Sequence, residues 1–301
     1  MKNKILFLCL CISVIGLAQT TELEDSLKAR KDKTPMGLNY GGVTALNFSQ
    51  TSLTNWSAGG NNSVSVNGLV NLYLNYRKES TIWNNTLDIG YGLLKQGKDA
   101  DVVKTDDHVE INSKYGVNAR ENWYYSGMIN FVTQMANGYQ DSGDSVKISA
   151  PFAPAYFTGA IGMDYQKNDD FNLYLSPLTT KITFVLDEEL SEKGAFGVKD
   201  DQSYRVELGG YIRTHLRLNL MQNVTMNTDL SLFSNYLDQP QNVDVDWKVF
   251  IAMKVNEYIS ANIMTHLIYD DNIKTVNDQG EEQGPEIQFK DIIGIGFSYS
   301  F

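Results

Sequence analysis

From Ile287 to Phe301 the chain reads IQFKDIIGIGFSYSF, and this last stretch decides the fold. Successive side chains of a β-strand point to opposite faces, so alternate positions define two surfaces. One surface is small or polar apart from Ile292. The other is apolar and carries Ile287, Phe289, Ile293, Ile295, Phe297, Tyr299 and Phe301. A two-faced strand with an aromatic apolar side and a terminal Phe is typical of the closing strand of an outer-membrane β-barrel.

The terminal aromatics also predict a partner during biogenesis. We expect Phe297, Tyr299 and Phe301 to form the signal that the barrel-assembly machinery reads. One residue breaks the apolar surface. Asp291 falls on it, and we expect this carboxylate to lie near the external rim.

The beginning of the chain predicts export. Lys2 and Lys4 precede an apolar run, and residues 1–18 are expected to be a signal peptide, followed by a periplasmic segment at 19–36. Both cysteines, Cys9 and Cys11, lie inside the signal peptide. The mature chain is therefore expected to hold no disulfide, no thiolate nucleophile and no cysteine metal site.

Residues 37–301 repeat the alternating pattern in segments long enough for tilted membrane-spanning strands. The clearest is Val64 to Tyr76. Short connections alternate with long ones, which predicts a single antiparallel transmembrane barrel of about twelve strands with both termini in the periplasm. Aromatic residues gather near both ends of these segments, as in the girdles of a barrel. Pro177 predicts a bulge in its strand. A β-sandwich with covered apolar faces is the structural alternative.

Two stretches resemble a known family. They are residues 47–60, NFSQTSLTNWSAGG, and residues 175–185, LSPLTTKITFV, followed by GAFGV at 194–198. Together they resemble a domain-of-unknown-function family of secreted proteins from the Bacteroidota. The resemblance implies a place at the outer membrane of a Gram-negative cell and implies no catalytic residue.

The predicted lumen holds most of the charged candidates. Arg213, His215 and Arg217 form a basic stripe on one strand, and Lys181 is expected to pair with Asp164. The lumen candidates are Lys181, Arg205, Glu207, Arg213, His215, Arg217, Asp229, Asp244, Asp246, Lys248, His266 and Lys290. They predict either a selectivity lining for an anionic solute or an ion-paired plug that fills a narrow polar interior. We favour the plug.

An enzyme is the alternative. A twelve-stranded phospholipase places a serine two residues from its histidine, and none of His108, His215 and His266 has that neighbour. Acid–histidine pairs from different loops leave a barrel hydrolase acting on lipid or lipopolysaccharide open as a second hypothesis.

The loops offer fewer candidates. Asn55 and Trp56 are expected either to contact a partner or to form a glycine-permitted turn. The long loops are acidic but match no calcium-binding spacing, so we expect no metal and no cofactor. With a net charge of −11, nucleic acid is excluded as a partner.

The sequence therefore predicts an outer-membrane barrel in contact with lipid and lipopolysaccharide. We expect it to be a narrow channel for small polar or anionic solutes, or an accessory subunit that binds another envelope protein.

Overall fold

The computed structural model describes residues 36–53, 61–98, 100–139, 146–168, 170–256, 258–273 and 284–300, and twelve of its strands form one closed antiparallel barrel. Their bounds are β1 (Gly37–Thr51), β2 (Ser63–Lys78), β3 (Thr81–Gln96), β4 (Val102–Arg120), β5 (Trp123–Thr133), β8 (Ala155–Asn168), β9 (Phe171–Phe184), β10 (Tyr204–Met221), β11 (Val224–Asn235), β12 (Asp244–Lys254), β13 (Ile259–Tyr269) and β14 (Gln288–Ser300). The predicted fold class and strand number are confirmed.

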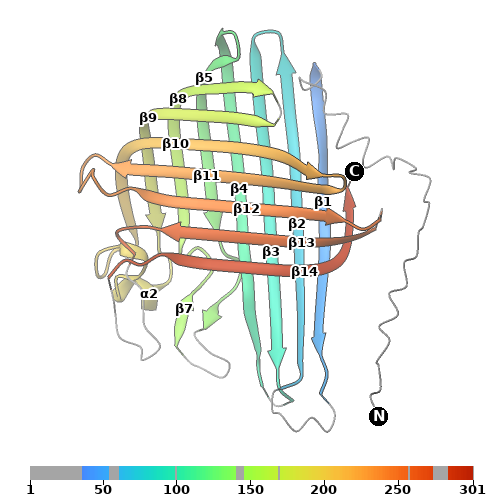
Figure 1. The fold of residues 1–301 in the computed structure, drawn as a ribbon. Coiled ribbons are helices and arrows are strands. Elements are labelled where there is room, and N and C mark those ends of the chain that lie inside the picture. Colours follow the sequence, from blue (N-terminus) through green and yellow to red (C-terminus); the bar gives the residue numbers. More distant parts are fainter. Residues whose placement is uncertain are drawn as a thin grey trace, which may run out of the picture.

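The closure joins the first and last strands of the chain. β14 pairs with β1 through the register Val43↔Ser300 to Asn47↔Gly296. In Figure 1, β10–β14 cross the front of the barrel at a steep angle to β1–β4 behind them. Strands on the near and far walls of a barrel cross in this way because every strand is tilted to the axis. Closure also rules out the β-sandwich alternative.

Short and long connections alternate as expected, with one exception. The β2–β3, β4–β5, β8–β9 and β10–β11 turns are short, and most of the others are long. The β3–β4 connection, predicted to be long, spans only residues 97–101 because both strands extend further than the sequence pattern indicated. The signal peptide and the segment before residue 36 lie outside the described residues and stay predictions.

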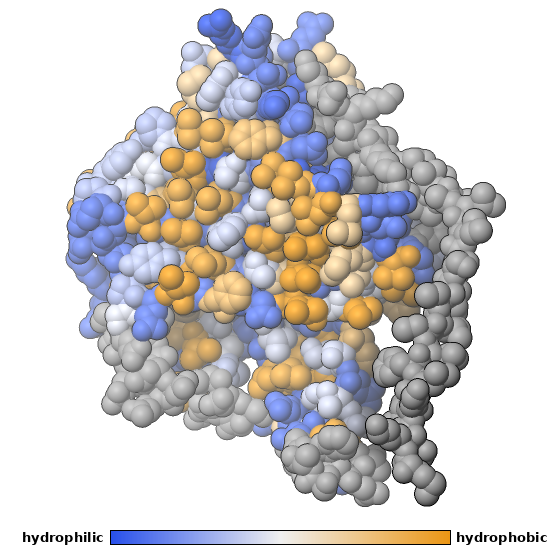
Figure 2. All heavy atoms as spheres, in the orientation of Figure 1, coloured by the Kyte–Doolittle hydropathy of each residue, from blue (hydrophilic) through white to orange (hydrophobic). Residues whose placement is uncertain are grey.

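The outer surface of the barrel is apolar. In the Val64–Tyr76 row both end residues are 40 % exposed, so this row faces away from the interior. Figure 2 shows hydrophobic residues spread over the wall that β10–β14 form. Beside the short turns, Trp123 and Tyr165 stack at 5.0 Å between ring centroids, and Tyr165 meets Phe171 at 6.3 Å. These contacts build part of the predicted aromatic girdle at that end.

Two local expectations are also confirmed. Asp291 is exposed and is the fourth residue of β14, on the side of the long loops. The ladder between β8 and β9 skips a residue between Ile161 and Met163, where Pro177 lies opposite. Proline cannot donate to a ladder, so the chain bulges at this point.

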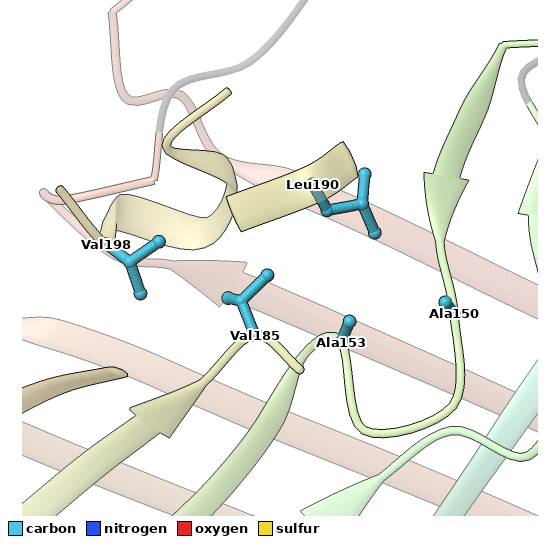
Figure 3. Close-up of a cluster of buried hydrophobic side chains, with 5 residues drawn as sticks. All are labelled: Ala150, Ala153, Val185, Leu190 and Val198. Carbon is cyan, nitrogen blue, oxygen red and sulfur yellow. The ribbon is translucent and has the colours of Figure 1, made fainter. Parts of the chain in front are cut away.

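Two long connections fold against each other at the end of the barrel that carries the long loops. The β5–β8 connection contains β6 (Gly138–Tyr139) and β7 (Lys147–Ser149), and the β9–β10 connection contains α2 (Glu188–Glu192) and the 3₁₀ helix η1 (Ala195–Gly197). Their small apolar core is drawn in Figure 3 and consists of Ala150, Ala153, Val185, Leu190 and Val198. Lys147 Nζ donates to Asp187 at 2.6 Å across the same contact. We call this unit the loop cap.

The bulge at Pro177 depends on a glycine, which gives a first prediction. A Cβ at Gly162 would lie 2.1 Å from the carbonyl oxygen of Leu175 and 2.7 Å from Cα of Ser176. Gly162→Ala is expected to lower the free energy of unfolding by about 1–3 kcal/mol, since backbone must move. The measurement is urea unfolding of the detergent-folded barrel. Gly127→Ala is the matched control, because nothing lies within 4 Å of its Cβ position. Equal stability of both variants would contradict the close packing.

Candidate functional site in the lumen

A bridge of charged side chains crosses the middle of the lumen. Lys248 Nζ of β12 donates to Glu110 Oε2 of β4 at 2.6 Å. In the closed strand order, six steps separate β4 from β12 either way, through β3, β2, β1, β14 and β13 or through β5, β8, β9, β10 and β11. These two residues therefore meet across the full diameter of the barrel. We call this contact the lumen bridge.

Further side chains hold Glu110 in place. Arg213 Nη2 of β10 lies 3.6 Å from Glu110 Oε1, and Asn130 Nδ2 of β5 donates to the same oxygen at 2.8 Å. The carboxylate is nearly fully buried. A buried carboxylate is tolerated when it is paired and hydrogen-bonded, and Glu110 has both kinds of partner. On the side of β1, Val43 is 42 % exposed, so the bridge constricts the lumen without filling it.

A second contact crosses the lumen from β4 to β14. Lys290 Nζ donates to Asp106 Oδ1 at 2.7 Å, and His108 Nδ1 lies 3.4 Å from the same oxygen. Beside this pair is a polar cavity of about 210 Å³, which Lys104 and Lys290 help to line. Lys104 is neutralised in turn by Asp107 at 2.8 Å. Both cations of the cavity are therefore already paired with carboxylates.

The predicted basic stripe exists, but it does not present bare positive charge. His215 Nδ1 lies 3.1 Å from Asp229 Oδ1, and Arg213 lies 4.0 Å from the same carboxylate. Arg217 is buried. On the adjoining strands, His266 Nε2 lies 3.1 Å from Asp246 Oδ1. This part of the lumen thus offers ion pairs where an anion-selective lining would offer unpaired cations.

A third cluster lies beneath the loop cap. Lys181 Nζ donates to Asp244 at 2.7 Å and to Asp270 at 2.8 Å. Arg205 lies 3.0 Å from Glu207 and donates from Nη1 to the carbonyl of Gly197 in η1 at 3.2 Å. The cluster therefore connects the barrel wall to the cap.

The expected pairing of Lys181 with Asp164 is wrong. Lys181 lies opposite Thr158, six residues from Asp164 along β8 (164 − 158), which is about 20 Å of strand. Asp164 is fully buried and accepts a hydrogen bond from Lys114 Nζ at 2.8 Å. The sequence pattern shows that both side chains point inward, but their heights along the barrel axis depend on the strand register, which the pattern does not give.

The sequence pattern placed Glu110 and Lys114 on an inner face but did not select them as site residues. Their signal was the run of alternate polar residues His108, Glu110, Asn112 and Lys114. Asn55, Trp56 and Phe301 lie outside the described residues, and their predicted roles stay predictions. Phe297 and Tyr299 are both exposed on the outer surface of β14.

The surroundings of the three histidines bear on the hydrolase hypothesis. Each histidine pairs with one aspartate, and among the described residues no hydrogen bond joins a hydroxyl nucleophile to any of the three imidazoles. Within the same part of the chain, no group of three or more acidic, histidine or cysteine residues is arranged to hold a metal ion. No helix there is long and apolar enough to cross a membrane.

Comparison with known families identifies one match. The model of a family described as "Protein of unknown function (DUF3078)" matches residues 48–139. This range includes most of the first stretch that carried the family resemblance and lies before the second. No curated protein matches the chain.

Solved structures similar to this chain include the translocator domain of the autotransporter NalP from Neisseria meningitidis, at 10 % identity and a TM-score of 0.38, covering 93 % of this chain and 95 % of that one. The COG4313 outer membrane channel from Pseudomonas putida F1 is 11 % identical with a TM-score of 0.42, covering 90 % and 97 %. The NanC porin is 8 % identical with a TM-score of 0.36, covering 85 % and 98 %. The fold assignment rests on the strand pairing of this chain itself.

Removing one partner of a buried lumen pair is expected to destabilise the barrel. Lys114→Met leaves the fully buried Asp164 without its cation, which costs roughly 3–5 kcal/mol for pairs of this kind. The measurement is urea unfolding of the detergent-folded protein. Lys193→Met is the control, because Lys193 is 57 % exposed and exposed ion pairs such as the one with Glu189 contribute little to stability. Equal losses in both variants would contradict the burial of the Lys114 pair.

The loop cap is expected to loosen in acid. The hydrogen bond from Lys147 lowers the pKa of Asp187, whose carboxylate also accepts from the backbone N–H of Leu190 at the start of α2. A depressed pKa stabilises the cap above the unfolded value near 3.8, and that stabilisation disappears as the pH falls through the folded value. Hydrogen exchange in α2 at pH 7 and pH 3 measures this. In Asp187→Asn the pH effect on α2 should be largely absent, and an unchanged effect would rule Asp187 out as its source.

Proposed function

We propose that the chain is an outer-membrane β-barrel that acts as an accessory subunit of an envelope assembly, with a lumen too constricted to serve as a standing pore. Its apolar outer surface and aromatic contacts support a place in a lipid bilayer. Lipid and lipopolysaccharide are its proposed surroundings, and export by the predicted signal peptide would deliver it there.

The observation that carries the proposal is the lumen bridge. Glu110 of β4 contacts Lys248 of β12 at 2.6 Å across the diameter, and Arg213 of β10 adds a second cation. A passing solute would have to break buried ion pairs, whose separation leaves uncompensated charge in a poorly solvated interior. A barrel whose lumen is constricted in this way fits membrane anchoring and surface binding better than solute passage.

The channel hypothesis is tested by the same residues. A channel for anions requires unpaired cations in the lumen, whereas Arg213, Lys248 and Lys290 each lie within 4 Å of a carboxylate. This pairing favours the constricted barrel over a selective pore for small anionic solutes.

Planar-bilayer recording decides between the two. The wild-type protein is expected to give no open-channel steps, because the lumen bridge spans the diameter and constricts the lumen. Glu110→Ala combined with Lys248→Ala removes both charges together, shortens both side chains and is expected to produce steps. Glu189→Ala combined with Lys193→Ala is the control, because it removes an exposed pair in the loop cap. Stable wild-type steps that the lumen double variant leaves unchanged would overturn the proposal in favour of a channel.

A further inference from the structure

The seam at which the barrel closes is much shorter than the strands that form it. β1 pairs with β2 along its whole length, from Gly37↔Arg77 to Thr51↔Ser63. Toward β14, its ladder ends at Asn47↔Gly296. Continuing that register would place Phe48 opposite Ile295 and Thr51 opposite Ile292, but these residues are unpaired, although the structure describes both strands in full up to residue 300. Beyond Gly296 the two strands separate.

The separation leaves a free edge on β14. From Gln288 to Ile295 this strand pairs with β13 on one side only. In an antiparallel strand alternate residues direct both backbone groups to the same side, so about four of these residues point donors and acceptors toward the seam. In Figure 1 the two strands meet at the end of β14 that carries the C label and diverge from there.

The free edge lies within the apolar outer surface. Ile293 and Ile295 are 71 % and 64 % exposed, and both belong to the unpaired stretch. Hydrocarbon supplies no hydrogen-bond partners, so open sheet edges do not occur at this depth of a bilayer unless protein covers them. In the membrane placement proposed above, the β14 edge therefore requires a strand to pair with it.

The side chains along the β14 edge indicate which residues the partner strand needs. Its outward positions are Phe289, Asp291, Ile293 and Ile295, so a partner strand needs apolar residues with one cation opposite Asp291. Among the described residues no ion pair to Asp291 is formed, and a cation directly opposite this exposed carboxylate at the rim would form a favourable cross-strand pair.

A second copy of the chain does not meet this need. Two β14 edges related by a two-fold axis must match outward residues with outward residues. A pairing centred on Asp291 places two carboxylates opposite each other, and a pairing centred on Ile292 places Asp291 opposite Ile293. Neither supplies a cation, because the other outward positions of the edge are apolar.

We infer that the β14 edge from Gln288 to Ile295 is the binding site for an extended, apolar strand of another envelope protein that carries a Lys or Arg opposite Asp291. This inference rests on the proposed accessory role and names the kind of partner. Pairing of a strand to an exposed edge is an established mode of recognition, in which backbone hydrogen bonds give affinity and side chains give specificity.

The separation of the seam is tested with paired cysteines. The mature chain is expected to lack cysteine. Leu46 pairs with Phe297 in the structure. Phe48 and Ile295 would be opposite each other if the same register continued, but they lie beyond the end of the ladder. All four side chains are exposed on the outer surface. In intact cells, Leu46→Cys/Phe297→Cys is expected to form a disulfide nearly completely. Phe48→Cys/Ile295→Cys is expected to form at least tenfold less. Equal yields would show that the seam is closed along its length and would overturn the inference.

The partner is tested with a photo-crosslinking amino acid at Ile293, with Tyr125 on the outer face of β5 as the matched position. Crosslinking to one distinct protein at Ile293 and not at Tyr125, lost in Asp291→Lys and retained in Asp291→Glu, supports the inference. Crosslinks to a second copy, to lipid alone, or to a protein insensitive to the charge at residue 291 would overturn it. The crosslinking result does not depend on the conductance result, so each experiment can contradict its own proposal independently of the other.

Discussion

Backbone hydrogen bonding is the constraint on which the rest of this structure depends. A sheet whose outer surface is apolar cannot leave N–H and C=O groups unpaired against lipid, and closing the sheet on itself removes its edges. Here closure is carried by a short ladder between β1 and β14. Gly296 allows the two strands to approach at this point, because a Cβ there would lie 2.1 Å from the carbonyl oxygen of Leu46 and 2.8 Å from Cα of Asn47. The strength of the barrel wall is thus uneven around its circumference.

Closure also fixes what happens inside. Inward side chains from opposite walls face each other across a narrow space, and a charge that becomes buried there needs a partner. Glu110, Asp106 and Asp164 each meet a lysine from a strand that is not their neighbour. Such pairs add little net stability compared with apolar packing, but they are costly to break singly. They therefore hold the far walls at a defined separation and constrict the lumen.

The long-loop end of the barrel is held together in a different way. The loop cap has a small apolar core of its own, together with the Lys147–Asp187 contact. Arg205 and Gly197 connect this unit to the charged cluster around Lys181 and Asp270. The barrel thus combines protein packing at the rim, ion pairs in the lumen and a short seam between β1 and β14.

The sequence alone determined the fold class, because strand periodicity is local. The two faces of each strand can be recognised from its alternate residues, and the short and long connections indicate the strand number. The bulge at Pro177 and the rim position of Asp291 followed in the same way. The inward residues were also largely identified, including the stripe of Arg213, His215 and Arg217.

Tertiary structure decided which of these inward residues meet. The partner of a lumen charge depends on strand register and on which walls lie opposite, and neither is a local property. The sequence analysis paired Lys181 with Asp164, whereas the structure places Lys181 beside Asp244 and Asp270 and pairs Asp164 with Lys114. Glu110 became the centre of the lumen only when β4 and β12 were placed at opposite ends of a diameter. The early end of the β1–β14 ladder could not be predicted either. Alternation predicts that a strand forms, but it does not predict how far that strand stays hydrogen-bonded to its neighbour.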